Sequence, residues 1–133
     1  MIEVVEHNNE TLAIIIRREY SVDGIQFFTP DDYSQQIGFM KRPAGYEIPP
    51  HIHNEVPRAI TMTCEALFIR HGAVRVDFYN DDCEYLTSRC LYEKDVILLI
   101  RGGHGFQMLS DSEIIEVKQG PYVGGADKVR FEP

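Results

Sequence analysis

The sequence lacks the features of a membrane, secreted or nucleic-acid-binding protein. Its longest apolar runs, Ala13–Ile16 and Val96–Ile100, hold only four or five residues, too few to span a bilayer. Lys and Arg number 13 against 21 Asp and Glu, a net charge of −8, which argues against binding nucleic acid or an anionic membrane through bulk charge. Residues 1–10 are acidic and carry no apolar segment of the kind found in secretion signals, so no secretion signal is expected.

Cysteine is scarce and has no recognisable spacing. Cys64, Cys83 and Cys90 are an odd number and form no CxxC pair. A cytoplasmic protein with free thiols is therefore expected. The sequence also has no GxGxxG, Walker or GxSxG motif and no Cys–His nucleophile pattern, which removes the commonest nucleotide-binding and acyl-transfer classes.

A sustained helical period is missing as well, and short strand-like segments take its place. These segments are rich in Ile, Val, Phe, Tyr and Thr and are separated by turn signals such as Asp23-Gly24 and Arg101-Gly102-Gly103. The chain of 133 residues has no repeat and no linker, so a single all-β domain, a sandwich or barrel, is expected. The predicted strands are Thr11–Arg17, Gly24–Phe28, Gln36–Lys41, Glu47–His53, Arg58–Thr63, Ala66–Arg70, Val74–Tyr79, Tyr85–Leu91, Val96–Ile100, Gly105–Leu109, Glu113–Lys118 and Lys128–Phe131.

Two of these strands are apolar at every position. Ala13–Ile16 and Val96–Ile100 do not alternate between apolar and polar residues, as a strand with one wet face does. Both of their faces are therefore expected to be covered. A second subunit is one way to cover the outer face, which favours a homodimer.

The most informative chemistry lies in the segment Gly45–His53. His51 and His53 are two residues apart, so on a strand their side chains point to the same face and can bind one metal ion. Imidazole suits Zn, Fe, Ni and Cu. The alternative is two partly exposed histidines at a strand end, each hydrogen-bonded to water or to the backbone.

The spacing around this pair resembles the first motif of the cupin superfamily, which reads Gly, five residues, HxH, a short spacer, Glu, six residues and Gly. Gly45, His51 and His53 fit the first half, and Glu65 followed by six residues and Gly72 fits the second. The spacer between His53 and Glu65 is eleven residues, longer than the three or four of the family pattern. A longer hairpin could return Glu65 to the site, and Glu55 is the other carboxylate nearby, so the sequence leaves Glu65, Glu55 or neither as the ligand.

A second stretch resembles the second cupin motif in degenerate form. Lys94–Phe106 has an acidic turn, an apolar strand, a Gly-rich turn and then His104. His104 comes one residue early, and a slip of one residue turns a strand's side chains to the opposite face. Because Gly102 and Gly103 can take positive φ, an altered turn can absorb the missing residue. We expect His104 to point inward, on the same face as Phe106 and Met108.

The resemblance covers residues 45–104 and implies a cupin-type jelly-roll β-barrel over the whole chain, residues 1–133. It implies one divalent metal ion (Fe, Mn, Ni or Zn) held by His51, His53, Glu65 and His104. Near strand ends, Tyr46, Arg58 and Lys118 are candidates for binding a small-molecule substrate. The sequence assigns no catalytic residue.

The cupin superfamily includes proteins of many functions, so the resemblance implies several alternatives for this chain. A metal-dependent isomerase or epimerase acting on a sugar or keto acid is the first hypothesis. The alternatives are an Fe(II)-dependent dioxygenase and a non-catalytic protein that binds a small ligand. We expect no nucleic-acid and no membrane partner.

Overall fold

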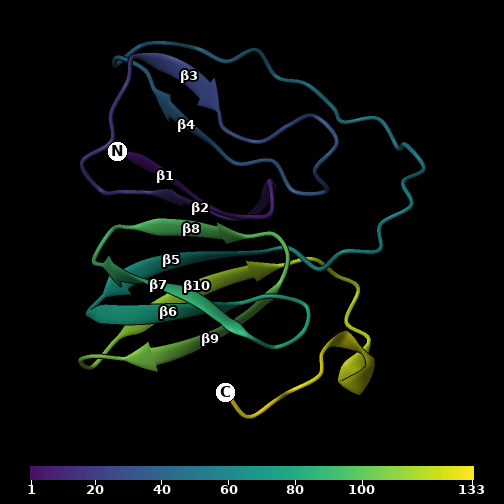
Figure 1. Ribbon diagram of the computed structural model, residues 1–133. Coiled ribbons are helices and arrows are strands. Elements are labelled where there is room, and N and C mark those ends of the chain that lie inside the picture. The colour runs from purple at the N-terminus through teal and green to yellow at the C-terminus, as the bar shows by residue number, and fades with distance from the viewer. The chain divides into compact units, whose positions relative to one another are not determined.

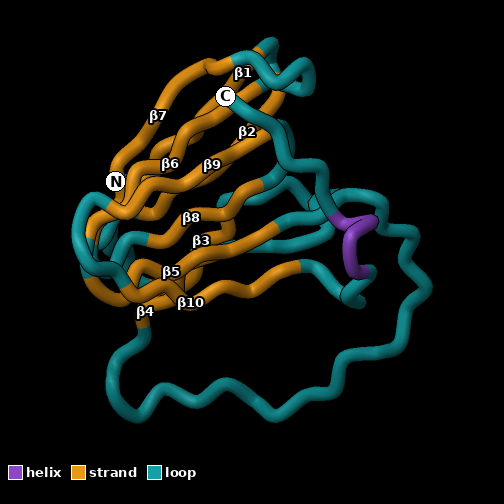
Figure 2. The backbone as a smooth tube through the Cα atoms, turned by 90° about the horizontal axis from the view of Figure 1, so that it is seen from below, coloured by secondary structure: helices purple, strands orange, loops and turns teal.

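The computed structural model describes residues 1–133 and divides them into two compact units. Unit 1 comprises Met1–Tyr20 and Thr63–Pro133, and unit 2 comprises Ser21–Met62. Unit 1 contains a five-stranded sheet in the order β1-β2-β8-β5-β10 and a three-stranded sheet in the order β7-β6-β9 (Figures 1 and 2). Unit 2 contains the two-stranded sheet β3-β4. Every strand pairing is antiparallel, and no sheet closes into a barrel, so the coarser prediction of an all-β fold is the one confirmed.

The strands are short and follow the turn signals of the sequence. In chain order they are β1 (Ile2–His7), β2 (Glu10–Ile16), β3 (Gly24–Phe27), β4 (Gly38–Lys41), β5 (Glu65–His71), β6 (Ala73–Tyr79), β7 (Tyr85–Tyr92), β8 (Val96–Leu99), β9 (Gly103–Met108) and β10 (Glu113–Lys118). One turn of 3-10 helix, η1 (Gly124–Asp127), follows β10.

The core of unit 1 lies between its two sheets. The five-stranded sheet contributes alternate residues of its strands, including Ala13, Ile15 and Leu99, and the three-stranded sheet contributes Val76 and Phe78. All of these side chains are at most 2% exposed. Burial of such side chains stabilises a fold by about 1.5–3 kcal/mol each, which makes this cluster the main source of stability in unit 1.

The two uniformly apolar strands are buried on both faces, as the sequence predicts. Ile14 of β2 and Leu98 of β8 pair with each other and point away from the core cluster. They are nevertheless 3% and 1% exposed.

Three predicted strands are absent, and one strand was not predicted. Glu47–His53, Arg58–Thr63 and Lys128–Phe131 form no strand. Pro49 and Pro50 have no backbone N–H to donate to a ladder, which explains why the segment stays outside a sheet despite its apolar residues. β1 is an edge strand that carries Glu3, Glu6 and His7, so its sequence looks like a polar terminus although Val5 is buried in the core.

Candidate functional site

Glu65 begins β5 and points into the sandwich of unit 1. It shares a face with Leu67 and Ile69, which are 5% and 1% exposed. Its register partners are Leu99 of β8 and Lys118 of β10. A carboxylate at this position is set among apolar side chains at the end of the core, and its side chain is only 15% exposed.

His104 lies on β9, in the opposite sheet, and points inward as expected, whereas its part in a metal site with His51 and His53 stays a prediction. It pairs with Phe78, a fully buried core residue, and directly paired residues of an antiparallel ladder point to the same side of the sheet. Gly102 takes φ of +78° in the turn before β9. Phe106 and Met108 share the core side with His104 but are half exposed, because β9 is an edge strand.

The two residues meet across the two sheets. The Nε2 atom of His104 lies 3.8 Å from Oε1 of Glu65, a separation too long for a hydrogen bond. Burial lowers the pKa of His104 below its ordinary value, partly offset by the negative charge of Glu116. At neutral pH the imidazole is therefore in its neutral form, the form that can bind a metal ion or accept a proton.

Glu65 has the opposite shift. Burial, followed by a hydrogen bond and charge repulsion from Glu116, raises the pKa of Glu65 to about 7. Glu116 lies on β10 opposite Leu67, so it is the diagonal neighbour of Glu65 on the same face. Two neighbouring carboxyls that share a hydrogen bond hold one proton between them, which places an acid close to neutrality inside the site.

Lys118 completes the polar end of the sandwich. It pairs with Glu65 in the ladder, and its Nζ atom lies 3.1 Å from Oδ2 of Asp127 in η1. Asp127 also accepts a hydrogen bond of 3.2 Å from the hydroxyl of Thr63. The Asp127 carboxylate raises the pKa of Lys118, and Lys118 in turn lowers the pKa of Asp127. The sequence-predicted Lys118 thus belongs to the same unit and the same sheet as Glu65.

Glu116 and Asp127 were missed by the sequence reasoning. Glu116 had a usable signal, because it is two residues before Lys118 on a predicted strand and so shares its face. Asp127 had none, since it lies in a short 3-10 turn that no periodicity marks.

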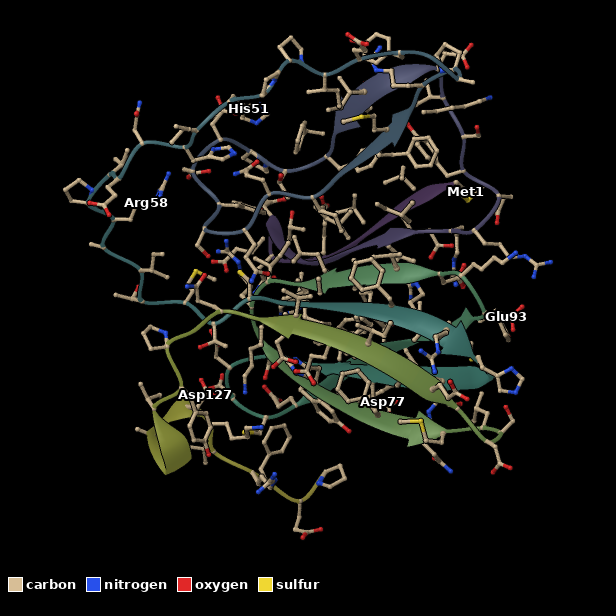
Figure 3. All side chains as sticks on the ribbon, turned by 180° about the vertical axis from the view of Figure 1, so that it is seen from behind. Met1, His51, Arg58, Asp77, Glu93 and Asp127 are labelled. Atoms are coloured by element: carbon tan, nitrogen blue, oxygen red, sulfur yellow. The ribbon has the colours of Figure 1, made fainter.

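The histidine pair belongs to unit 2. The imidazole rings of His51 and His53 are 5.2 Å apart between centroids, in an edge-to-face arrangement. Nδ1 of His51 lies 3.0 Å from the carbonyl oxygen of Pro49. The pair lies in an extended loop, labelled at His51 and Arg58 in Figure 3, and every residue from 42 to 63 is exposed. The prediction that a strand brings the two rings together is wrong, although the rings are close.

The remaining substrate candidates also lie in unit 2. Tyr46 packs under the guanidinium of Arg42, whose Cζ atom is 4.4 Å from the ring centroid. Arg58 and Glu55 are exposed in the same loop. The structure therefore brings together Glu65, His104 and Lys118 in unit 1, and separately groups His51 and His53 in unit 2. It contains no group of three or more His, Cys, Asp or Glu side chains placed to hold one metal ion.

Comparison with known proteins gives no relative: no family model, no curated protein and no solved structure matches this chain. None of its helices has the length and apolar character needed to cross a membrane.

Proposed function

We propose that this protein is a cupin-type, metal-dependent enzyme that isomerises or epimerises a small polar metabolite, a sugar or a keto acid. The single observation that carries the proposal is the approach of His104 to Glu65 across the two sheets of unit 1. These are the two residues that the cupin-like motifs single out in this part of the chain. The jelly-roll arrangement is part of the same proposal.

The donor chemistry fits a divalent metal ion. Within unit 1, Glu65 offers carboxylate oxygens and His104 a neutral imidazole nitrogen. Such mixed N and O donors suit Fe, Mn, Ni or Zn. We propose Glu65 and His104 as ligands of one ion in unit 1, and the assignment of His51 and His53 in unit 2 stays a prediction from the sequence. Bound there, the ion supplies Lewis acidity toward a carbonyl or hydroxyl oxygen of the substrate.

The chain's own residues then move the proton. Glu116 is hydrogen-bonded to Glu65 and is the carboxylate beside the site that is not a proposed ligand. We propose that its carboxylate takes the proton from the carbon next to the substrate carbonyl; for isomerisation it returns the proton to the neighbouring carbon, and for epimerisation water supplies a proton from the opposite face. Lys118, positioned by Asp127, offers a positive charge for a substrate oxygen.

Elemental analysis of untagged protein prepared without chelators tests the metal. We expect about one ion per chain, and a large loss in His104→Ala and in Glu65→Gln. The matched controls are His71→Ala and Glu93→Gln, an exposed histidine–glutamate pair on the surface of unit 1 with atoms 3.4 Å apart. Equal metal content in the site variants and the controls would contradict the proposed ligands.

Solvent deuterium tests the chemistry without knowledge of the product. Isomerisation and epimerisation both remove a proton next to a carbonyl, so NMR of sugars and keto acids incubated with the protein in D2O should show deuterium at that carbon. Glu116→Gln should stop the exchange while keeping the metal. The control Glu113→Gln changes an exposed residue of the same strand that binds Arg70. Oxygen consumption with iron and no exchange would instead indicate a dioxygenase, and neither activity would indicate a binding protein.

A further inference from the structure

The last part of unit 1, residues 120–133, follows β10 and forms no further strand. We call it the C-terminal strap. Figure 2 shows it running from the end of β10 through η1 and past the strand ends to the C-terminus. The strap makes no backbone hydrogen bond to either sheet, and its apolar residues Tyr122, Val123 and Val129 are 82%, 58% and 88% exposed. It is therefore attached to the sheets by a few side chains only.

The first attachment of the strap is Asp127, which binds the five-stranded sheet. Its carboxylate oxygens accept hydrogen bonds from Nζ of Lys118 at 3.1 Å and from the hydroxyl of Thr63 at 3.2 Å. Lys118 is the register partner of Glu65, and Thr63 precedes Glu65 by two residues. The strap is therefore fixed at one end next to the Glu65 carboxyl.

The second attachment is Phe131, which binds the three-stranded sheet. Its ring lies 5.1 Å from the ring of Tyr79 between centroids, in an edge-to-face arrangement. The ring also uses the space that Gly103 leaves open, since a Cβ atom at Gly103 would lie 3.1 Å from Cζ of Phe131. Gly103 directly precedes His104 on β9. The other end of the strap is therefore fixed next to the second residue of the site.

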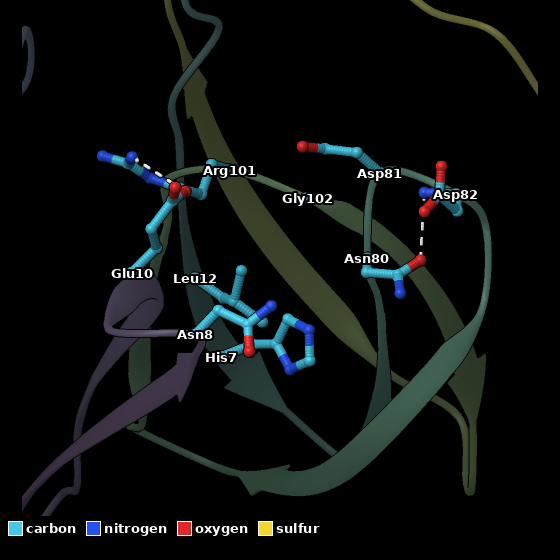
Figure 4. Close-up of a pocket in the computed structure, with 9 residues that line it drawn as sticks. All are labelled: His7, Asn8, Glu10, Leu12, Asn80, Asp81, Asp82, Arg101 and Gly102. Carbon is cyan, nitrogen blue, oxygen red and sulfur yellow. Dashed lines mark hydrogen bonds and ion pairs between the residues drawn. The ribbon is translucent and has the colours of Figure 1, made fainter.

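The β8–β9 turn that leads into Gly103 is held in place without the strap. Figure 4 shows Arg101 of this turn ion-paired with Glu10 of β2, with Nη1 3.2 Å from Oε2. The backbone N–H groups of Ile100 and Arg101 donate to the carbonyl oxygen of Leu12 at 2.9 and 3.4 Å. The surface that receives Phe131 is thus formed by the turn and β2, and the strap is the part that can leave it.

Between its two attachments the strap crosses from one sheet to the other. The four steps from Asp127 to Phe131 can reach at most roughly 14 Å, and packed sheets lie about 10 Å apart. The backbone is extended at Lys128, with φ of −151° and ψ of 160°. Burial raises the pKa of Glu65 and lowers that of His104, and the positive charge of Lys128 acts to lower both, which places Lys128 near both groups.

Under the strap, the side chains of Glu65 and His104 are only 15% and 27% exposed. A segment without ladder hydrogen bonds and with few buried contacts opens at a much lower free energy than the core. We propose that the C-terminal strap is a lid over the Glu65–His104 site. It opens locally when Asp127 and Phe131 release the two sheets, and so admits a small ligand. The lid goes beyond the proposed isomerisation, and its test needs neither metal nor substrate.

Diethyl pyrocarbonate, which acylates accessible neutral imidazoles, tests whether the lid opens in the wild-type protein. Chelator-treated full-length protein is labelled, and mass spectrometry of its peptides gives the rates at His104 and at the exposed His71. We expect His104 to react more slowly than His71, at a rate that hardly changes with urea below the unfolding transition, because local opening exposes little surface. A His104 rate that rises with urea in step with global unfolding would overturn the lid, because the strap would then be a fixed part of the fold.

Two variants without a change of charge each loosen one attachment. Phe131→Ala removes the ring, and Thr63→Val removes the hydroxyl that binds Asp127 while keeping its shape. Loss of the ring contacts should shift the opening equilibrium so that His104 is labelled roughly tenfold faster in Phe131→Ala. Thr63→Val should give a smaller acceleration, because the ion pair of Asp127 remains.

The matched control is Val129→Ala, which changes an exposed residue of the same strap and should be labelled at the wild-type rate. Urea unfolding of each variant defines the range in which it is folded, and the rates are compared within that range. The rate at His71 should be the same in all the proteins. Unchanged labelling of His104 in both attachment variants would show that the strap does not limit access to the site, which would overturn the proposal.

Discussion

Glu65 of β5 and His104 of β9 belong to different sheets, yet Oε1 of one lies 3.8 Å from Nε2 of the other at the polar end of the unit 1 core. Nearly forty residues separate them in the chain. Their environments push their pKa values in opposite directions, down for the imidazole and up for the carboxyl. Near neutrality the His104 imidazole is therefore largely uncharged and the Glu65 carboxyl is about half protonated, and pH becomes a direct probe of this site.

The first prediction concerns pH and Glu65 in metal-free protein. Its pKa rises from the ordinary value of 4.5 to about 7 on folding, so the folded state retains a proton that the unfolded state loses. The stabilisation that this bound proton gives the folded state is fully present below pH about 4.5 and is lost as pH rises through about 7. Urea unfolding in the presence of a chelator should show wild-type stability falling across this range relative to Glu65→Gln. Parallel curves for the two proteins would contradict the raised pKa, and Glu93→Gln, an exposed change, is the control.

A second prediction concerns Asp95, a charged residue only 2% exposed. Its carboxylate accepts bonds from Arg17 at 3.0 Å and from the backbone N–H groups of Arg18 and Tyr92 at 2.9 and 2.8 Å. Asp95→Ala removes one carboxylate partner of the part-buried Arg17 guanidinium and leaves two N–H groups unpaired, and should lower the free energy of unfolding by about 3–5 kcal/mol. Chemical denaturation measures this.

The control for Asp95 is the exposed Asp111. Asp111→Ala should change stability by no more than about 0.5 kcal/mol. A similarly small loss in Asp95→Ala would mean that Arg17 is satisfied by its other partners, the Glu3 carboxylate at 3.0 and 3.2 Å and the carbonyl oxygen of Cys90 at 2.6 Å.

A third prediction separates steric from conformational cost at Gly102. A Cβ atom there would lie 2.8 Å from the carbonyl oxygen of Tyr79, in a turn with φ of +78°. Gly124 also has positive φ, 65°, but a Cβ there meets nothing within 4 Å. Gly124→Ala should therefore lower the free energy of unfolding by about 1–2 kcal/mol, because only the backbone conformation is unfavourable there. Gly102→Ala should lower it clearly more, because the added methyl group also clashes with the Tyr79 carbonyl oxygen. Thermal denaturation compares the two, and an equal loss would show that the turn shifts to accept the methyl group.

A fourth prediction is a homodimer, tested on the outer face of the five-stranded sheet. Phe68, Ile115 and Val117 point to that face and remain 41%, 49% and 53% exposed. Covering such side chains stabilises an assembly by up to about 1.5–3 kcal/mol each. Light scattering should give about twice the chain mass of 15.3 kDa. Ile115→Lys should give the monomer.

The control for the dimer is Val129→Lys, which changes a residue that is 88% exposed outside the sheets. It should leave the mass unchanged. A wild-type mass near that of one chain would contradict the prediction outright.

Local sequence determined much of the architecture. Alternation on β5 placed Glu65 on the face of Leu67 and Ile69, because successive strand residues point to opposite sides. The uniformly apolar segments Ala13–Ile16 and Val96–Ile100 were correctly predicted to be covered on both faces. Turn residues such as Gly102 marked where strands end, since few residues tolerate positive φ.

Tertiary structure alone decided the rest. Whether the segment with His51 and His53 becomes a strand depends on a neighbouring strand that can pair with it, and its own composition does not specify that neighbour. Pro49 and Pro50 make pairing still less favourable, because they have no backbone N–H to donate. Asp127 reaches Lys118, and Arg101 reaches Glu10, through contacts between chain segments far apart in sequence. Sequence patterns report the face on which a side chain lies, because that is a local property of the backbone. Which side chains from other strands meet it is fixed only when the sheets pair and pack.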